Sequence, residues 1–548
     1  MENKNICIVS ERKNRPTKIW VSVACAIASM APIHQVSAVN IDTGNPDIRM
    51  SFNNTLRYSA AWRVEDQNEE VLSSYNPNLD DGDRNFEKGL ISNRLDLISE
   101  LDFKYKRRYG FRLSGAAWYD DAYNGSTDND GSGLSNNLDG DFDEFPEDTE
   151  RLHGRDAEIL DAFAYGNFYI GDKSLSMKAG QYTQIYGESL FFGGNSIAAA
   201  QGPIDVVKLL SVPGATFQEI LRPVEQIGAN LIVNSTISIG AYYQFEWEES
   251  RLPGSGSYFS FADFVDEGGK YIFLPPSLGG LSQRAADVSP SDDGQFGVQV
   301  KIKGGEYEYG LYAAQYHDKF PQFYVRPNSS EYALAYGENI QTLGASVSTL
   351  IGEANVAAEA SIRRDMPLAG FGNVLVDAAE NGDGDDNALF PVGNTFHAQV
   401  SAITFLNEGP LWDGATFLGE VAYNRITSID KNRDQLDPNT DRSTSALRVL
   451  FEPEYFQVVQ NLDLKLPIGI GYGIVGNSAI GGTGFSPEGG GDLSVGLDFT
   501  YMRNWRGGLR YTHYFGSDGG ILDENAALSG DQVLGDRDFI SFNIQRTF

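Results

Sequence analysis

The sequence predicts an all-β protein: a closed antiparallel transmembrane β-barrel of about 18 strands, within a range of about 14 to 18. Three observations lead to this prediction. The chain begins with a targeting segment, and its apolar residues alternate with polar ones as far as the last residue. The connections between the expected strands are alternately short and long. Together these features are typical of barrels that cross an outer membrane.

The first 38 residues read as a signal peptide. A basic stretch precedes an apolar stretch at 19–31, which is too short to span a bilayer, and "VSA" at 36–38 fits a cleavage site before Val39. Both cysteines, Cys7 and Cys25, lie in this segment, so disulfide scaffolds and thiolate metal sites are excluded from the mature chain. We therefore expect a single domain, the barrel, over 39–548.

Charge excludes other classes of protein. The chain carries a net charge of −33, and because residues 1–38 contribute +3, the rest carries −36. A basic surface for nucleic acid is absent from this composition. After residue 38 the sequence has no apolar run long enough for a transmembrane helix.

The clearest alternation lies in a hairpin at 94–119. Leucine, phenylalanine and tyrosine occupy one face from Leu95 to Tyr105 and again from Phe111 to Tyr119, with charged residues between them. Successive side chains of a strand point to opposite faces. We expect the apolar face to meet lipid and the charged face, with Asp102 and Arg112, to line the lumen.

The same pattern recurs at 50–64, 462–472, 493–501 and 538–548. Tight connections such as "IGDKS" and "KGGEY" alternate with long ones such as 124–156 and 250–292, which predicts short turns at one end of the barrel and long loops at the other. The terminal Phe548 is the kind of residue that barrel-assembly machinery is understood to read. We expect that machinery, outer-membrane lipid and lipopolysaccharide as partners in the outer membrane of a Gram-negative bacterium.

Several long stretches resemble a known family. They are "VNIDTGNPDIRMSFNNTLRYSAAWRVE", "DDGDRNFEKGLISNRLDLISELDF", "AAWYDDAYNG" and "GQYTQIYGESLFF". They are similar to proteobacterial outer-membrane proteins of domain of unknown function 1302, and the likeness covers nearly the whole mature chain. Tyr186 stands where the family pattern leads us to expect tryptophan.

The resemblance implies a function in transport. Family members are often encoded beside a periplasmic protein and a resistance-nodulation-division (RND) permease, near genes for sterols, terpenes or fatty acyl compounds. This implies passage of hydrophobic or amphipathic small molecules in an envelope transport system with these two proteins as partners. A diffusion porin for small polar or cationic solutes is the first alternative, and a structural or receptor barrel that binds a surface partner is the second.

The segment 185–226 is too apolar for an ordinary surface loop, and its prolines exclude a long helix. "PIDVVKLL" predicts a short helix with Pro203 at its first position. We expect the segment inside the barrel, as a plug or as an apolar constriction that holds substrate. Together with a second apolar loop at 258–274, it supplies the predicted substrate path: Phe191, Phe192, Val206, Leu209, Leu210, Phe217, Leu221, Phe259 and Phe261. For the second loop, a local core and a hydrophobic entry surface are the two alternatives.

Acidic stretches at 78–86, 137–145 and 380–387 resemble calcium loops without completing the twelve-residue pattern. Solvated loops and loops joined by Ca²⁺ or Mg²⁺ are both possible, and the best metal candidates are Asp139, Asp141 and Asp143. No other cofactor is expected. The four histidines after residue 38 are scattered and no serine is marked as a nucleophile, so we predict that the protein is not an enzyme.

Overall fold

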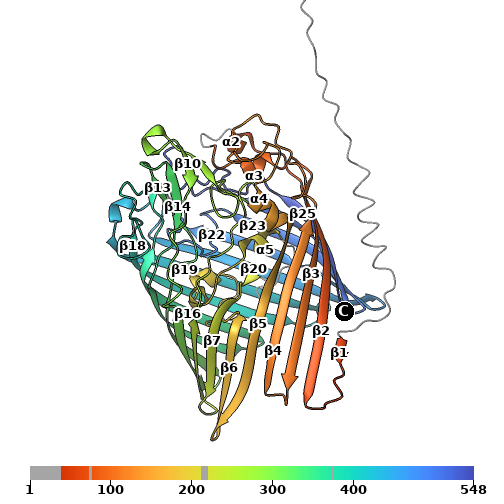
Figure 1. The fold of residues 1–548 in the computed structure, drawn as a ribbon. Coiled ribbons are helices and arrows are strands. Elements are labelled where there is room, and N and C mark those ends of the chain that lie inside the picture. Colours follow the sequence, from red (N-terminus) through yellow and green to blue (C-terminus); the bar gives the residue numbers. More distant parts are fainter. Residues whose placement is uncertain (1–38, 73–76, 212–219, 372–373) are drawn as a thin grey trace, which may run out of the picture.

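The computed structural model describes residues 39–72, 77–211, 220–371 and 374–548, and it is a closed β-barrel (Figure 1). The main sheet contains 20 strands and closes where the first long strand, β2, pairs with the last, β25. Short β1 lies beyond the end of β25 on the same side of β2, so these two strands share one position in the barrel wall. β21 and β22 likewise share one position, between β20 and β23. The barrel wall therefore has 18 strand positions, and the predicted fold is confirmed.

The strands of the barrel are long because each must cross the apolar layer of a bilayer. Their bounds are β1 (Val39–Ile41), β2 (Ile48–Arg63), β3 (Leu90–Tyr105), β4 (Tyr109–Asp120), β5 (Arg155–Ile170), β6 (Lys173–Tyr182), β7 (Val224–Ile232), β8 (Ile237–Gln244), β11 (Phe296–Gly304), β12 (Tyr307–Tyr316), β15 (Ile340–Ile351), β16 (Ala354–Pro367), β18 (Val392–Leu406), β19 (Gly414–Lys431), β20 (Ser443–Val459), β21 (Leu462–Lys465), β22 (Ile468–Val475), β23 (Gly491–Tyr501), β24 (Trp505–Phe515) and β25 (Phe539–Thr547). Pro467 separates β21 from β22 because proline has no N–H to donate, while its carbonyl still accepts from Gly496 at 2.8 Å.

Alternation decides what each face of the barrel meets. The outward residues of the 94–119 hairpin are exposed, among them Leu97 at 41% and Leu113 at 47%, whereas Arg112 on the inner face pairs with Asp102. Aromatic residues are exposed near the short turns, as in the interfacial belt of a membrane protein; they include Tyr105, Tyr109, Tyr169, Tyr307, Tyr309 and Tyr501. The predicted faces are confirmed for this hairpin.

The connections are sorted by length between the two ends. Short turns join β3 to β4, β5 to β6 and β23 to β24 at one end, and every short helix lies in the long connections at the other (Figure 1). These helices are α2 (Glu69–Leu72), α3 (Asp81–Arg84), α4 (Glu147–Thr149), η1 (Glu150–Gly154), η2 (Gly193–Asn195), η3 (Ile197–Ala200), α5 (Val206–Ser211), η4 (Pro276–Leu278) and η6 (Arg433–Gln435). Among the described residues, no helix is long and apolar enough to cross a membrane.

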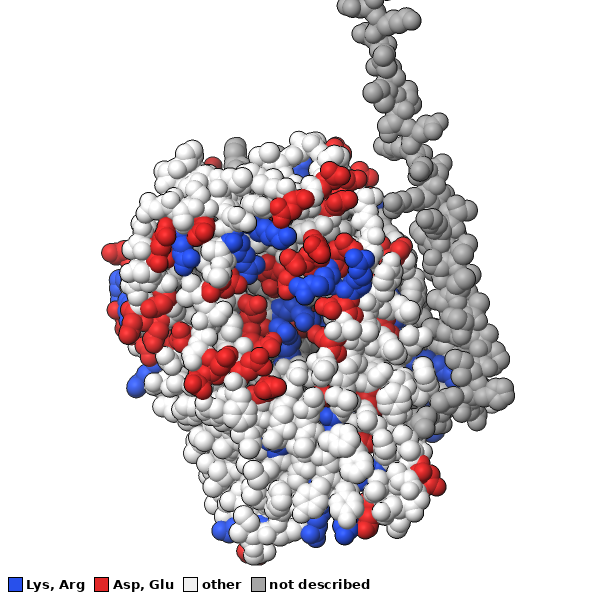
Figure 2. Space-filling model, viewed as in Figure 1, with Lys and Arg blue, Asp and Glu red and all other residues white. Residues whose placement is uncertain are grey.

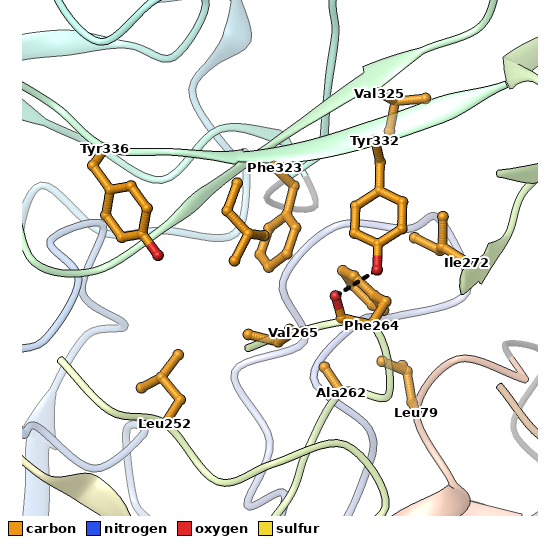
Figure 3. Close-up of a cluster of buried hydrophobic side chains, with 11 residues drawn as sticks. Leu79, Leu252, Ala262, Phe264, Val265, Ile272, Phe323, Val325, Tyr332 and Tyr336 are labelled. Carbon is orange, nitrogen blue, oxygen red and sulfur yellow. Dashed lines mark hydrogen bonds between the residues drawn. The ribbon is translucent and has the colours of Figure 1, made fainter. Parts of the chain in front are cut away.

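The long loops fold into a cap over the barrel mouth. A second sheet pairs β9 (Tyr271–Phe273), β10 (Leu281–Arg284), β13 (Gln322–Arg326), β14 (Glu331–Ala335) and β17 (Val374–Val376). Figure 3 shows the apolar cluster beneath it, where Phe264 packs against Phe323 and the Tyr332 hydroxyl donates to the Phe264 carbonyl at 3.0 Å. The cap thus has a hydrophobic core of its own.

Buried ion pairs fasten this cap to the barrel rim. The Arg63 guanidinium, at the end of β2, lies 2.7 Å from Asp83 and 2.9 Å from Asp536, and Arg537 also contacts Asp83. Two cations and two carboxylates therefore balance one another inside the cap, which is the condition for burying charge. On the face seen in Figure 2, charged residues gather at the loop end, above a mostly uncharged barrel wall.

Candidate functional site: the inner loop and the barrel wall

The connection between β6 and β7, residues 183–223, enters the barrel and is called the inner loop here. It follows the wall from β8 as far as β20. Tyr186 packs on Tyr242 of β8 and Tyr312 of β12, and Phe192 packs on Ala422 of β19. Of the segment predicted to be internal, 185–226, residues 186–197 lie against the inner wall, whereas 224–226 belong to β7 in the wall itself.

Two carboxylates of the wall hold the loop through its backbone. Glu359 of β16 accepts hydrogen bonds from the amides of Glu188 at 2.8 Å and Ile197 at 2.7 Å. One oxygen of Glu420 on β19 accepts from the three successive amides of residues 190–192, at 3.2, 2.6 and 3.0 Å. Successive amides that converge on an anion form a nest, and charge-assisted hydrogen bonds offset the cost of burying each carboxylate.

A polar cluster fixes the tip of the inner loop. Asn195 accepts from His397 Nδ1 at 2.9 Å and from Asn424 Nδ2 at 3.3 Å, and the other ring nitrogen of His397 bonds Thr395 at 2.8 Å. Arg363 donates to two loop carbonyls. His397 is thus a buried group whose two ring nitrogens bond an amide and a hydroxyl.

The space left beside the loop is narrow. A cavity of about 50 Å³ lies between glycines and alanines of the loop and the side chains of Tyr316, Phe320 and Met366. Ligand pockets commonly hold about 300–1,000 Å³. This cavity is therefore too small, as it stands, to hold a typical ligand.

The part of the inner wall that the loop leaves uncovered is polar and exposed to solvent. Arg112 pairs with Asp102 through two hydrogen bonds of 3.1 and 2.9 Å, and Arg448 pairs with Asp492 in the same way at 3.0 and 3.1 Å. The two arginine side chains are 35% and 40% exposed, although both point into the barrel. The lumen thus has an apolar side, made by the loop, and a charged side.

The barrel wall is interrupted beside the loop. The ladder between β5 and β6 ends at Ala162 and Gln181, so residues 155–161 of β5 have no strand partner on that side. α5 lies next to this break, where Lys208 bonds Glu158 at 2.5 Å and Arg251 bonds both Glu158 and Asp205 at 2.9 Å. The predicted helix is confirmed, but Asp205 caps it through the Lys208 amide, at 2.8 Å, and Pro203 precedes it.

The outer side of the break is apolar. Ile159 of β5 is 59% exposed and Leu209 of α5 is 51% exposed. Toward the loop end, a polar cavity of about 260 Å³ lies among Arg151, Arg222 and Arg251 and five carboxylates. Figure 2 shows a basic group ringed by acidic residues on the loop half of this face. Apolar side chains thus face outward at the break, and ion pairs lie behind them.

The predicted substrate-path residues fall into separate places. Phe191, Phe192 and Leu221 lie along the inner loop, and Leu221 lines the narrow cavity. Val206 and Phe261 pack against the cap cluster of Figure 3, while Leu210 packs with Phe259 in a neighbouring cluster. Phe217 lies outside the described residues. The second apolar loop therefore forms a local core, one of its two predicted alternatives.

The predicted metal candidates are not brought together. Asp139 is exposed and bonds Lys270 at 3.2 Å and Tyr271 at 2.9 Å, and Asp141 is also exposed. Within the described part of the chain, Asp139, Asp141 and Asp143 do not form a group of carboxylates with facing oxygens. The structure instead groups three aspartates that the prediction did not single out.

Those three are Asp80, Asp81 and Asp263, from the β2–β3 and β8–β11 loops. One oxygen of each lies within 4.8 Å of the others. Burial raises the pKa of Asp80 to about 6 and that of Asp81 to about 7, and it raises the pKa of Asp263 well above its usual range. A buried acidic cluster of this kind can bind a cation.

Sequence reasoning also missed Glu359 and Glu420. Both occupy inward positions of their strands, and small residues lie two positions away on the same face: Ala357 and Ser361 around Glu359, and Ala422 after Glu420. A charged residue beside small inward residues leaves room for another segment to lie on the wall. That pattern is the signal that could have identified them.

Comparisons with known proteins identify one family. A profile of the family described as "Protein of unknown function (DUF1302)" matches residues 19–548. No curated protein matches the chain.

Three solved structures illustrate its likeness to outer-membrane proteins. OpdK from Pseudomonas aeruginosa is 10% identical, with 91% of this chain and 98% of that chain covered and a TM-score of 0.42. OccAB1 from Acinetobacter baumannii is 8% identical, with 91% and 96% covered and a TM-score of 0.42. The channel DcaP from A. baumannii is 10% identical, with 94% and 100% covered and a TM-score of 0.37.

Proposed function

Since the chain belongs to the DUF1302 family, whose description assigns no activity, we propose its function from its geometry. The protein is an outer-membrane barrel of a Gram-negative bacterium that passes hydrophobic or amphipathic small molecules. The observation that carries this proposal is the inner loop, which presents small and apolar residues to a closed constriction while Glu359 and Glu420 hold its backbone.

The break beside β5 supports a lateral route for such molecules. In a complete barrel wall every backbone group of a strand is paired, and lipid cannot approach the lumen. Here α5 lies at the interruption, with Leu209 exposed like the outward Ile159 of β5 and with Lys208 bonded to Glu158. Movement of α5 would join the outer leaflet to the inner loop without passing the cap. A periplasmic carrier and an RND-type permease are the partners that would complete the path.

A diffusion porin is the second candidate, favoured by the exposed Arg112–Asp102 and Arg448–Asp492 pairs on the opposite wall. Paired charges of both signs in a wet lumen suit small polar solutes. The two candidates differ in what the intact protein should admit. A closed apolar constriction admits lipophilic molecules selectively, whereas a porin admits sugars and carries a steady ion current.

Deletion of residues 191–202 tests the proposal. The barrel ladder lies outside this segment, so the variant should assemble, and its ion conductance in planar bilayers should rise because the constriction is gone. The intact protein should accelerate uptake of the lipophilic dye N-phenyl-1-naphthylamine into liposomes and show little swelling in arabinose. Rapid arabinose swelling in the intact protein would favour the porin. Dye uptake that the deletion leaves unchanged would contradict a role for the loop.

The lateral route can be tested separately, since the mature chain has no cysteine. Glu158→Cys with Lys208→Cys, joined by a short bifunctional thiol reagent, should fix α5 and stop dye uptake until the link is reduced. Glu454→Cys with Lys465→Cys is the matched control. Glu454 and Lys465 also form an ion pair, of 2.7 Å, but this pair joins two neighbouring strands. Equal loss in both variants, or no loss in the first, would rule out the route through the break.

A further inference from the structure

The cap contains three carboxylates with unused oxygens. Asp80, Asp81 and Asp263 are only 3%, 3% and 1% exposed, and one oxygen of each lies within 4.8 Å of the others. In each residue Oδ1 is buried and receives no hydrogen bond from any described group. Orphan carboxylate oxygens are costly in a protein interior, and a cation bound within this group would supply a partner to all three residues.

The second oxygen of each carboxylate is fixed by the protein. Asp80 Oδ2 accepts from Arg84 Nε at 2.7 Å, and Asp263 Oδ2 accepts from the Asp81 amide at 3.0 Å. Asp81 Oδ2 accepts from the Asn136 amide at 2.8 Å and the Ser135 hydroxyl at 3.0 Å. Hydrogen bonds to one oxygen therefore orient each group and leave the other oxygen available, as in metal sites whose ligands are held by their surroundings.

Hydrogen bonds join the loops around the cluster to one another. Asn136 Nδ2 donates to the Asn78 side chain at 3.0 Å and to the Tyr271 carbonyl at 2.8 Å, and the Asp263 amide donates to the Asn78 carbonyl at 2.8 Å. The β2–β3, β4–β5 and β8–β11 loops thus meet at this point. Anything bound there would join three loops of the cap.

Charge selects the ligand. When all three carboxylates are ionised, they and the Arg84 guanidinium carry a net charge of −2, whereas Asp83 and Asp536 are already balanced by Arg63 and Arg537. A divalent cation would neutralise the remainder. Opposite ligands of Ca²⁺ lie about 4.8 Å apart, since each Ca²⁺–oxygen distance is about 2.4 Å, and Ca²⁺ accepts irregular oxygen shells that Mg²⁺ does not.

We propose that Asp80, Asp81 and Asp263 bind one Ca²⁺ ion that joins the loops of the cap. The ion replaces hydrogen-bond donors for the three orphan oxygens, and water or backbone carbonyls complete its shell. The proposal does not depend on the transported molecule, because it concerns the cap alone. Loss of Ca²⁺ would loosen the cap while the barrel ladder stays intact.

The test uses the full mature protein in detergent, stripped with EGTA. Calorimetric titration with CaCl₂ should give one site, and trypsin should cut the cap at least threefold more slowly in Ca²⁺ than in EGTA or MgCl₂. Asp263→Asn should weaken Ca²⁺ binding at least tenfold, and Asp139→Asn, an exposed control, should leave it unchanged. Slower migration after heating in SDS gels shows that each variant contains a folded barrel.

A comparison in EGTA separates the proposal from its main rival, in which Asp81 and Asp263 share a proton. Asparagine at position 263 is neutral at every pH, and ionising the buried aspartate is costly, so without Ca²⁺ the cap of Asp263→Asn should resist trypsin at least as well as the wild-type cap. With Ca²⁺ the order should reverse. The proposal is overturned if the wild-type protein binds no Ca²⁺ at 1 mM, or if Asp263→Asn binds it equally well. Protection by acid alone, with no effect of Ca²⁺, would establish the shared proton.

Discussion

Phe548 and Asn54 exchange two backbone hydrogen bonds of 2.8 Å each, and these bonds close the barrel at the end of the chain. Directly beyond them Val39 pairs with Phe52, so β1 continues the line of β25 along β2. Figure 1 shows β1 just below the C-terminus. The two ends of the mature chain therefore share one side of the first long strand.

This arrangement predicts the effect of removing β1. A chain that lacks residues 39–44 should still assemble, because β2 and β25 keep their ladder, but it should melt a few degrees lower. Each backbone hydrogen bond contributes only about 0.5–1.5 kcal/mol. Removing Phe548 should also lower the yield of assembled barrel, measured by heat-modified mobility in gels. Equal yields from the two deletions would contradict a special role for the terminal residue.

Processing provides a second prediction. The mature chain should begin at Val39, the first residue of β1, because "VSA" precedes it. Mass spectrometry of the protein from outer-membrane fractions should give this N-terminus and no reactive thiol. Retention of Cys25 in the mature chain would show that cleavage occurs elsewhere.

Adjacent residues of β23 test the environment of each barrel face. Val495 points outward and is 45% exposed near mid-strand, whereas its neighbour Ser494 points inward. Val495→Arg should destabilise the barrel by about 2–4 kcal/mol, because arginine would lie in the bilayer midplane. Ser494→Arg should be milder, since Asp492 and Asp498 occupy the same inner face. Urea unfolding in lipid vesicles measures both, and equal effects would mean that the outer face does not meet lipid.

Loss of the Glu420 charge should loosen the inner loop. In Glu420→Gln the amides of residues 190–192 keep only a neutral acceptor, and charge-assisted hydrogen bonds are about twice as strong as neutral ones. Hydrogen exchange at these amides should therefore become at least tenfold faster, with larger fluctuations in single-channel current. Glu454→Gln is the control, because this carboxylate bonds Lys465 and does not touch the loop. Unchanged exchange in Glu420→Gln would show that packing alone holds the segment.

The raised pKa of Asp266 leads us to expect that the stability of the cap depends on pH. Burial, then the nearby Glu249 carboxylate, raises its pKa from 3.8 to about 7. The folded cap binds this proton more tightly than the unfolded one, so the resulting stability is complete below about pH 4 and is lost as the pH rises through 7. Trypsin should cut the wild-type cap faster at pH 8 than at pH 5.

Asp266→Asn should reduce that difference. Asparagine keeps the acceptor for the Leu252 amide, suits the positive φ of 55° at this position and has no proton to lose. The ratio of trypsin cutting rates at pH 8 and pH 5 should be smaller for the variant than for the wild type, after correction for the protease itself. A wild-type cap that is equally resistant at pH 5 and pH 8 would contradict the assignment to Asp266.

The sequence by itself determined the barrel. The period-two pattern of residues such as Leu95 and Leu97 fixes which side of each strand faces lipid, and this pattern survives in the sequence because it is local. The lengths of the turns fixed which end carries the loops. Apolar composition and prolines also placed the inner loop inside the lumen, since lipid-facing and solvent-facing positions could not accommodate it.

Only the tertiary structure decided what the loops do. Glu359 and Glu420 accept hydrogen bonds from amides that lie more than 160 residues away along the chain. Asp263 of the β8–β11 loop lies close to Asp80 and Asp81 of the β2–β3 loop. Acidic stretches look alike in sequence, so the sequence does not distinguish Asp139 from Asp81. In the structure Asp139 is exposed and paired with a lysine, whereas Asp81 is buried and has an oxygen without a hydrogen bond. Local patterns encode the faces of strands, whereas contacts between distant loops depend on how the closed barrel brings the loops together.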